Sequence, residues 1–425
     1  MYFWYKFFTY LFYPISPIYL FFRKWKKKEH SERYKEKMSS IKIQREKGFL
    51  MWFHVASVGE AMSILPLIEH FEKEKNVNTI LITTVTLSSA KVLGKKFISN
   101  KKIVHQFLPL DINYFIEKFL KHWRPNISIF IDSEIWPNLI IKIKEKNIPL
   151  LLVNARITEK SFKRWNLVKN FSKKVFGKID LCIASNTESE NFLKNLGAKN
   201  IKNYGNLKFA KSKLDSNKKL NVDFLSKIKN RKIWCAASTH PSEEIFCANV
   251  HKIIKGNHKN VLSIIIPRHV ERSYKILEIL KKENLKVLLH DQLDQLNDDI
   301  DVLIVNKYGE TLKFYQKAKC VFLGKSLIES LKNDSGQNPL EAARMGCKIF
   351  HGPYTSNFNE VYKFLNLLKI SQEINSPEVL GKLITEELSI EKVIDQDVVK
   401  KIENYGANTL NNVLNEINVY ISNSR

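Results

Sequence analysis

Short apolar runs alternate with amphipathic stretches from residue 50 onward. Apolar runs predict buried strands, and the longer amphipathic stretches between them predict helices, for example at 113–121 and 139–146. Strands that alternate with helices in this way predict a parallel, doubly wound sheet. The predicted strands of the first half are 50–55, 79–84, 103–107, 127–131, 150–154 and 181–184.

A polar stretch at 211–230 separates this series from a second one. The predicted strands of the second half are 233–236, 262–266, 286–289, 302–305, 320–323 and 348–350. Residues 398–421 predict an amphipathic helix, and the charged residues 29–48 predict a short linker helix. Two α/β halves with a hinge near 205–230 describe a GT-B glycosyltransferase, with two facing Rossmann-like domains. They also describe periplasmic-type binding proteins and epimerases, so the fold alone does not decide the function.

The first 28 residues are rich in aromatic side chains and end in a basic cluster. Residues 2–22 contain twelve aromatic side chains and one charge, and a cluster of basic residues follows at 23–28. One helix of this length would measure about 30 Å, enough to cross a bilayer. The aromatic excess, with Pro14 and Pro17, also fits a segment that lies in the membrane interface, and a buried N-terminal helix is the third alternative. We expect a membrane anchor whose basic cluster stays cytoplasmic.

The net charge of +26, from 69 basic and 43 acidic residues, favours an anionic partner such as a phosphorylated substrate or an acidic membrane. The abundance of Lys, Ile and Asn, typical of an AT-rich genome, accounts for part of that charge. Outside the N-terminus no basic run is interleaved with aromatic residues, so we expect no nucleic-acid partner. The five cysteines form no CxxC pair and no metal-ligand spacing, so we expect reduced core thiols and no metal site.

The strand at 50–55 runs into the sequence Ser57-Val58-Gly59-Glu60, and a helix is predicted at 61–73. Open α/β sheets build their sites where a strand passes through a turn into a helix. Glu60 is therefore a candidate general base. The alternative is purely structural, because the helix macrodipole favours a glutamate in the first helical turn.

Two further strands of the second half end in polar residues. Arg268 and His269 follow the strand at 262–266, where Arg268 could bind a phosphate group and His269 could donate a hydrogen bond to it. A surface loop is the alternative. Gly309 follows the strand at 302–305, and a glycine there lets backbone N–H groups approach an anion.

A glycine-containing loop at 335–338 leads into another helix. Asn338 is predicted as its N-cap and Pro339 as its first helical residue. Glu341 then lies in the first turn, where its carboxylate could accept hydrogen bonds from both hydroxyls of a ribose. The alternative is that this is only a well-capped helix.

Taken together, the chain resembles the 3-deoxy-D-manno-octulosonic acid (Kdo) transferase family of lipopolysaccharide synthesis over nearly its whole length. The motifs that carry the resemblance are VASVGEA (55–61), LPLD (108–111), WRPNISIFIDSEIWPNL (123–139), LLVNARIT (151–158), YGNLKFA (204–210), WCAASTHPSEE (234–244), IIPRH (265–269), YGE (308–310), GQNPLEAARMG (336–346) and GPYTSNF (352–358).

The resemblance implies a GT-B fold and an inverting transfer of Kdo from CMP-Kdo to a lipid A precursor, lipid IVA, with release of CMP. It implies that Glu60 is the general base and that Asp132 and Lys208 stabilise the transition state. CMP binding would fall on Arg268, His269, Tyr308, Gly309, Glu310, Asn338, Pro339, Leu340 and Glu341. The leaving group is a monophosphate, so we expect no metal and no cofactor.

The resemblance also implies an anchor with a basic flank at 1–28 and a location on the cytoplasmic face of the inner membrane. We divide the rest into a Rossmann-like acceptor domain (29–210), a Rossmann-like CMP-sugar domain (211–395) and a C-terminal helix (396–425) expected to pack back on the acceptor domain.

The chain departs from the family pattern at three sites. The usual Glu-x-Glu is Asp132-Ser133-Glu134, so Glu134 is a second candidate carboxylate, and the loops at 305–310 and 335–339 also differ. The alternatives are another GT-B nucleotide-sugar transferase and an inactive basic protein of the membrane surface.

Overall fold

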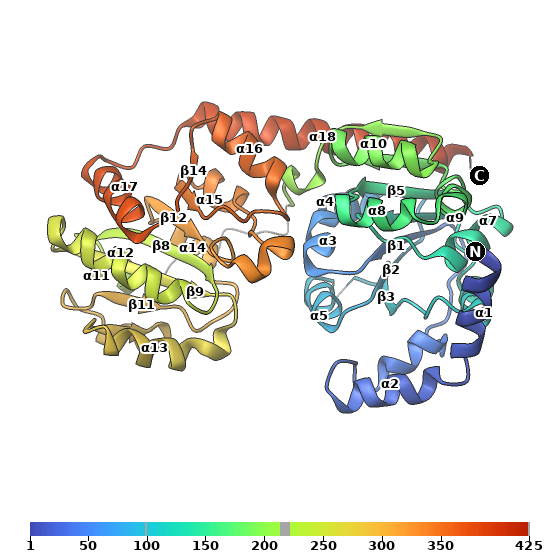
Figure 1. The fold of residues 1–425 in the computed structure, drawn as a ribbon, viewed down its shortest axis with the longest axis horizontal. Coiled ribbons are helices and arrows are strands. Elements are labelled where there is room, and N and C mark those ends of the chain that lie inside the picture. Colours follow the sequence, from blue (N-terminus) through green and yellow to red (C-terminus); the bar gives the residue numbers. More distant parts are fainter. Residues whose placement is uncertain (98–99, 213–221, 424–425) are drawn as a thin grey trace. The chain divides into compact units, whose positions relative to one another are not determined.

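The computed structural model describes residues 1–97, 100–212 and 222–423. The chain forms two compact units: the first comprises residues 1–215 and 403–425, and the second comprises residues 216–402 (Figure 1). Each unit is built around a seven-stranded sheet in which every strand pair is parallel. The doubly wound α/β architecture predicted from the alternation of apolar and amphipathic segments is therefore confirmed for both halves.

The first sheet has the order β3-β2-β1-β4-β5-β6-β7, so the strand order reverses between β1 and β4. In this sheet the sequence pattern missed β7, a short edge strand that lacks an apolar run, and in the second sheet it missed the edge strand at 371–373 for the same reason. The strands are β1 (Leu50–Val55), β2 (Thr79–Thr84), β3 (Ile103–Phe107), β4 (Ile127–Ile131), β5 (Leu150–Ala155), β6 (Leu181–Ala184) and β7 (Ile201–Asn203).

Helices cover both faces of this sheet. The helices of the first unit are α1 (Tyr2–Phe12), α2 (Ser16–Trp25), α3 (Val58–Ser63), α4 (Leu65–Lys73), α5 (Leu87–Lys96), α6 (Asn113–Trp123), α7 (Pro137–Glu145), α8 (Glu159–Asn166), α9 (Lys169–Phe176), α10 (Thr187–Leu196) and the end of α18 (Gln396–Asn423), with 3₁₀ turns at η1 (Arg33–Met38) and η2 (Leu207–Phe209).

Two helix predictions need correction. The helix predicted at 61–73 is two helices, α3 and α4, because Pro66 has no N–H group to continue the first helix. The linker helix predicted at 29–48 is reduced to the 3₁₀ turn η1, because its charged side chains bind the domain instead of forming a solvated helix. Arg33 of η1, for example, donates to the carbonyl oxygen of His105 at 2.8 Å.

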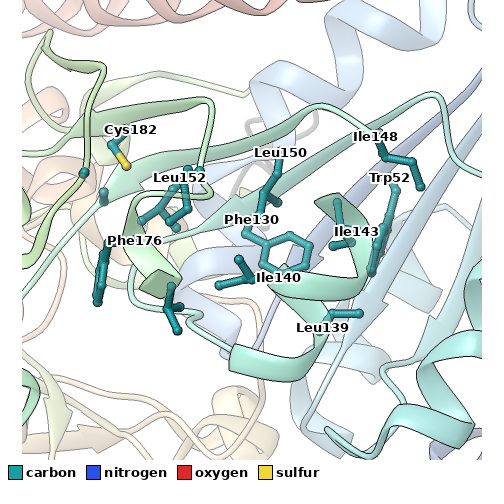
Figure 2. Close-up of a cluster of buried hydrophobic side chains, with 14 of the residues drawn as sticks. Trp52, Phe130, Leu139, Ile140, Ile143, Ile148, Leu150, Leu152, Phe176 and Cys182 are labelled. Carbon is teal, nitrogen blue, oxygen red and sulfur yellow. The ribbon is translucent and has the colours of Figure 1, made fainter. Parts of the chain in front are cut away.

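The alternation of side chains along each strand fills two apolar layers. Leu50 and Trp52 of β1 pack with α6, α7 and α9 on one face of the sheet, and Figure 2 shows side chains of α7 and of strands β1, β4 and β5 gathered there. Met51 and Phe53 point to the opposite face, where α4 packs and where α18 contributes buried side chains such as Ile417. Burial on both faces explains why the strands are almost continuously apolar.

The sheet of the second unit has the order β10-β11-β9-β8-β12-β13-β14, with its reversal between β8 and β12. Its strands are β8 (Lys232–Thr239), β9 (Val261–Pro267), β10 (Val287–Leu289), β11 (Val302–Ile304), β12 (Cys320–Leu323), β13 (Lys348–His351) and β14 (Ser371–Glu373). The helices around it are α11 (Val222–Lys227), α12 (Glu243–Asn257), α13 (Ser273–Lys282), α14 (Thr311–Tyr315), α15 (Leu340–Arg344), α16 (Asn359–Leu367) and α17 (Pro377–Ser389), with 3₁₀ turns at η3 (Val270–Arg272), η4 (His290–Gln295) and η5 (Glu329–Asp334).

The aromatic N-terminal segment forms two short helices, α1 and α2, rather than one long helix. Pro14 lies between the two helices, and Pro17 is the second residue of α2, in a first turn where its missing N–H group costs nothing. Within the described ranges, no helix combines the length and the apolar character needed to cross a membrane. Figure 1 shows α1 beside α7 and α9, and Tyr2 of α1 stacks on Phe171 of α9.

The close packing of α18 gives a first prediction. A Cβ atom at Gly406 would lie 2.1 Å from the carbonyl oxygen of Phe209, so Gly406→Ala should destabilise the protein by about 1–3 kcal/mol. In Gly94→Ala, the control in α5, the new Cβ meets nothing within 4 Å, so the variant should gain about 0.5–1 kcal/mol. Thermal unfolding followed by circular dichroism measures both. Equal stability of Gly406→Ala and wild type would contradict this packing.

Candidate active site

A cluster of charged side chains lies in the first unit, at the edge where the parallel strands end. Glu60 follows β1 and Asp132 follows β4, the two strands between which the strand order reverses. Such a reversal point is where open α/β sheets bind their ligands. Arg156 follows β5, and Lys208 lies in the turn η2 after β7. Three residues predicted from the sequence, Glu60, Asp132 and Lys208, are thus brought to one edge.

Glu60 lies in the first turn of α3 and is held by three hydrogen bonds. Its carboxylate accepts the backbone N–H of Ala56 at 2.7 Å and the hydroxyl of Ser57 at 2.8 Å, while its own N–H donates to the Ser57 hydroxyl at 3.3 Å. Ser57 is the N-cap, so the two side chains together cap the start of α3. The structural role of Glu60 is therefore real, and it fixes the position of the carboxylate.

The electrostatic setting of Glu60 goes beyond that of a capping residue. Burial, followed by the negative charges of Glu134 and Asp132, raises the pKa of Glu60 to about 8, against the lowering effect of its hydrogen bonds to Ala56 and Ser57. A carboxyl group with a pKa near neutrality can take up a proton from a substrate hydroxyl. The hydrogen bonds of the cap alone would lower the pKa of Glu60, so its rise comes from burial and from the neighbouring carboxylates.

Asp132 is held in the left-handed region, with φ 61°. Aspartate tolerates this conformation better than most residues. Its N–H donates to the Val153 carbonyl at 3.1 Å and its carbonyl accepts the Arg156 N–H at 3.3 Å, which joins the ends of β4 and β5. Burial raises the pKa of the Asp132 carboxyl, and the positive charges of Lys208 and Arg156 counteract that rise.

Lys208 is positioned by two asparagines. Asn154, with φ 54°, accepts the N–H of Leu207 at 2.9 Å through its side chain, and Asn206 accepts the N–H of Lys208 at 2.9 Å. Burial lowers the pKa of the Lys208 ammonium group, while the charges of Asp132 and Glu60 raise it. The lysine thus supplies positive charge to both carboxylates, inside a partly desolvated site.

Glu134 is the second carboxylate of the loop that follows β4. It lies 3.0 Å from Nε2 of the buried His54 and accepts the indole N–H of Trp136 at 2.8 Å. Burial would raise the pKa of Glu134, but the hydrogen bond from His54 and its charge outweigh this effect. The pKa of Glu134 is therefore lowered. Glu134 is therefore the carboxylate that stays ionised beside Glu60.

The sequence analysis did not assign roles to His54 and Arg156. His54 lies in the predicted strand at 50–55, and Arg156 lies in the motif LLVNARIT. The available signal was a polar side chain at the carboxyl end of an otherwise apolar strand. What could not be read from the sequence is that the ends of β1, β4 and β5 are adjacent, which depends on the strand order.

The residues expected to bind CMP lie in the second unit, after β9, β11 and β12. Arg268 and His269 follow β9 directly and are exposed, and the ring of His269 lies 6.0 Å from that of His240. The Tyr308 hydroxyl, in the loop after β11, donates to Glu271 at 3.0 Å, which connects the β9 and β11 loops.

Gly309 and Glu310, two predicted residues of the loop after β11, differ in their surroundings. Gly309 has φ 83° and nothing within 4 Å of the position of a Cβ, so its backbone conformation, not crowding, calls for glycine. Glu310 is buried and forms an ion pair with Lys313 of α14. The structure thus brings Tyr308 toward the β9 loop and places the Glu310 carboxylate in contact with its own helix.

The loop before α15 differs from the prediction by one residue. Helix α15 begins at Leu340, so Pro339 is its N-cap and Asn338 precedes it, instead of Asn338 capping a helix that starts at Pro339. The physical reason is that the Asn338 side chain accepts the N–H of Leu340, two residues on, at 3.0 Å, and so forms a turn before the helix. Glu341 lies in the first turn, as expected.

Glu243, which the sequence analysis did not single out, organises the reversal point of the second sheet. Its buried carboxylate accepts the backbone N–H groups of His240, Lys325, Ser326 and Leu327 at 2.8–3.2 Å. Burial raises its pKa, and these four bonds oppose the rise. The ends of β8 and β12 are thereby fixed in one arrangement. Among the residues placed in the structure, no three His, Cys, Asp or Glu side chains converge on a possible metal position.

Comparisons with known proteins identify relatives of this chain. The family model described as 3-Deoxy-D-manno-octulosonic-acid transferase (kdotransferase) matches residues 29–211. The 3-deoxy-D-manno-octulosonic acid transferase of Rickettsia bellii is 33% identical, with 96% of this chain and 94% of the relative covered.

Solved structures share the fold. A UDP-N-acetylglucosamine 2-epimerase matches with a TM-score of 0.58 at 14% identity, covering 90% of this chain and 98% of the other. A glycosyltransferase from Rickettsia africae matches with a TM-score of 0.53 at 15% identity, covering 88% and 98%.

The two doubly wound parallel sheets form the GT-B fold, and the matched family and relatives show that the chain is a glycosyltransferase of this class. Within that class, the relative from Rickettsia bellii matches nearly the whole chain at 33% identity, which shows the family. The chain belongs to the 3-deoxy-D-manno-octulosonic acid transferase family.

The raised pKa of Glu60 predicts how stability depends on pH. The folded state holds the carboxyl protonated up to a pKa of about 8, whereas the ordinary value is 4.5, so wild type loses stability as the pH rises between these values. Glu60→Gln cannot ionise. Its stability relative to wild type should therefore increase from pH 4.5 to above pH 8, as measured by thermal midpoints.

The matched control for this measurement is Glu159→Gln, which changes an exposed glutamate of α8 paired with Lys163. Its stability relative to wild type should show no such increase. A constant difference between Glu60→Gln and wild type across the whole range would refute the raised pKa.

Proposed function

We propose that this enzyme transfers Kdo from CMP-Kdo to a hydroxyl group of a lipid A precursor, lipid IVA, at the cytoplasmic face of the inner membrane. Family membership supports the transferred sugar. The observation that carries the mechanism is the position and the raised pKa of Glu60, in the charged cluster at the reversal point of the first sheet.

In the proposed reaction, Glu60 accepts the proton of the acceptor hydroxyl as its oxygen attacks the anomeric carbon of Kdo. The new bond forms between these two atoms, the bond from the anomeric carbon to the phosphate oxygen breaks, and CMP leaves with that electron pair. Attack from the face opposite CMP inverts the anomeric centre. A base with a pKa of about 8 is well matched to this transfer near neutral pH.

The positively charged side chains of the cluster can stabilise the negative charge that develops during the reaction. Lys208 and Arg156 lower the pKa of Asp132, so the three form an electrostatically coupled set beside Glu60. Preorganised charges in a partly desolvated site stabilise a transition state more than water does. We assign Asp132 and Lys208 to transition-state stabilisation and propose that Arg156 assists them.

We assign the donor nucleotide to the second unit. Arg268 and His269 are exposed after β9, where they suit the phosphate of CMP. Glu341 suits the ribose hydroxyls, and the remaining contacts fall on Tyr308, Gly309, Glu310, Asn338, Pro339 and Leu340. Because CMP leaves as a monophosphate, we propose that the transfer requires neither a metal ion nor a cofactor.

We propose that residues 1–28 hold the protein on the membrane by lying in its interface. α1 has 11 residues, about 16 Å, which is too short to cross a bilayer. A basic cluster follows at once, as an acidic lipid surface favours. The exposed apolar side chains of the two helices are Phe3, Trp4, Phe7, Phe8, Tyr10, Leu11, Ile18, Tyr19, Phe21, Phe22 and Trp25.

Substitutions at the two assigned sites should separate chemistry from donor binding. Glu60→Gln should reduce transfer to lipid IVA, measured by mass spectrometry, by about a thousandfold or more and leave CMP affinity within about twofold, because only the base is lost. Arg268→Ala should instead weaken CMP binding by about tenfold or more, because a charged hydrogen bond is lost. Loss of CMP binding in Glu60→Gln would contradict its assignment as the base.

The exposed aromatic side chains of α1 predict membrane affinity. Trp4→Ser and Phe8→Ser should each weaken sedimentation with anionic vesicles by about tenfold, because each removes a large apolar group from the lipid interface. Leu367→Ser, which changes an even more exposed apolar residue of the second unit, is the control and should bind as wild type does. Undiminished binding of both α1 variants would exclude the interfacial attachment.

A further inference from the structure

The inner face of α1 makes specific polar contacts with the first unit. The Tyr5 hydroxyl donates to Oδ2 of Asp111 at 2.7 Å, and the Tyr5 ring packs 5.7 Å from that of Phe171. One turn further along α1, the Thr9 hydroxyl accepts a hydrogen bond from Nδ2 of Asn138 at 3.0 Å. A helix that served only as a membrane anchor would not require hydroxyl groups aligned on its protein side.

Asp111 is the centre of these contacts. It is 9% exposed, and it accepts the N–H groups of Asn138 at 3.0 Å and Leu139 at 2.9 Å in addition to the Tyr5 hydroxyl. Its backbone carbonyl accepts the Asn138 side chain at 2.8 Å. Asn138 and Leu139 lie in the first turn of α7, so Asp111 satisfies N–H groups that a helix start leaves without intrahelical partners.

The start of α7 is directly connected to the acidic cluster. Trp136 is the N-cap of α7, and its indole N–H donates to Oε2 of Glu134 at 2.8 Å. The charge of Glu134 is the largest electrostatic contribution to the raised pKa of Glu60. A shift at the start of α7 therefore moves Trp136, and with it the carboxylate that tunes Glu60.

We propose that Tyr5 and Asp111 are positioning residues of the active site: through the start of α7 they make the N-terminal helix α1 part of the machinery that holds Glu134 beside Glu60. The reaction itself is the one proposed above, and the activity readouts rest on it. The outward face of α1 carries the exposed aromatic side chains, so one helix both contacts lipid and orders the site. Deletion of the N-terminal segment would consequently remove a part of the site as well as an anchor.

Tyr5→Phe in the full-length protein tests this connection, because it removes one hydroxyl and leaves the aromatic packing in place. Amide hydrogen exchange measured by mass spectrometry should become about tenfold faster at Asn138 and Leu139. In the transfer assay kcat should fall by about tenfold while KM for CMP-Kdo stays within twofold, because the donor residues lie in the other unit.

A further readout distinguishes positioning from general stabilisation. If Glu134 moves away from Glu60, the pKa of Glu60 falls, so the acid limb of the pH profile of kcat/KM should shift to lower pH in Tyr5→Phe. The matched control is Tyr420→Phe, which removes a tyrosine hydroxyl that donates to the Asp180 carbonyl at 3.1 Å in the same unit. The control should leave exchange at α7, kcat and the pH profile unchanged.

The outcomes separate the two proposals. Exchange at Asn138 and Leu139 that is unaltered in Tyr5→Phe overturns the connection whatever the reaction is. Faster exchange with wild-type kcat and an unshifted acid limb also overturns it, because the connection would then be structural only. Faster exchange in Tyr5→Phe, with wild type inactive on CMP-Kdo and lipid IVA, would instead contradict the proposed function and retain only the link between α1 and the start of α7.

Discussion

The desolvation of Glu60 beside two other carboxylates is the constraint on which the rest of the site depends. Like charges held together in a partly buried place raise the pKa of one of them, and here the structure raises that of Glu60 to about 8. His54 and Trp136 keep Glu134 in place, and Lys208 and Arg156 offset the charge of Asp132. Each of these groups stands at the end of a strand or in an adjoining turn, so the parallel sheet sets their spacing.

The amino-acid sequence predicts much of this architecture because buried parallel strands are almost continuously apolar. The central strands were placed within a few residues, whereas the edge strand β7 was missed because Lys202 and Asn203 face solvent. Glu60 could be singled out because it follows the apolar strand β1 within Ser57-Val58-Gly59-Glu60, a sequence that leads into a helix. Its raised pKa could not be predicted, because it depends on Glu134 and Asp132, which are distant in sequence and meet only through the strand order.

Local hydrogen bonding accounts for the remaining differences. Pro66 divides a predicted helix, and the Asn338 side chain moves the start of α15 by one residue. Tertiary contacts of the N-terminal segment also could not be predicted. Its aromatic composition predicts lipid contact but not the hydrogen bond from Tyr5 to Asp111. The composition predicts the exposed aromatic face of α1. Only the tertiary structure shows that the opposite face is connected, through Asp111 and the start of α7, to Glu134.

The most direct test of this account is the pH dependence of kcat/KM for Kdo transfer from CMP-Kdo to lipid IVA, which reports the ionisation of the free enzyme. The account predicts activity that rises with pH through an acid limb near pH 8, because Glu60 must lose its proton before it can act as the base. An acid limb at the ordinary carboxyl value of about 4.5, or a rate independent of pH between 6 and 9, would contradict the central role given to the buried carboxylate cluster.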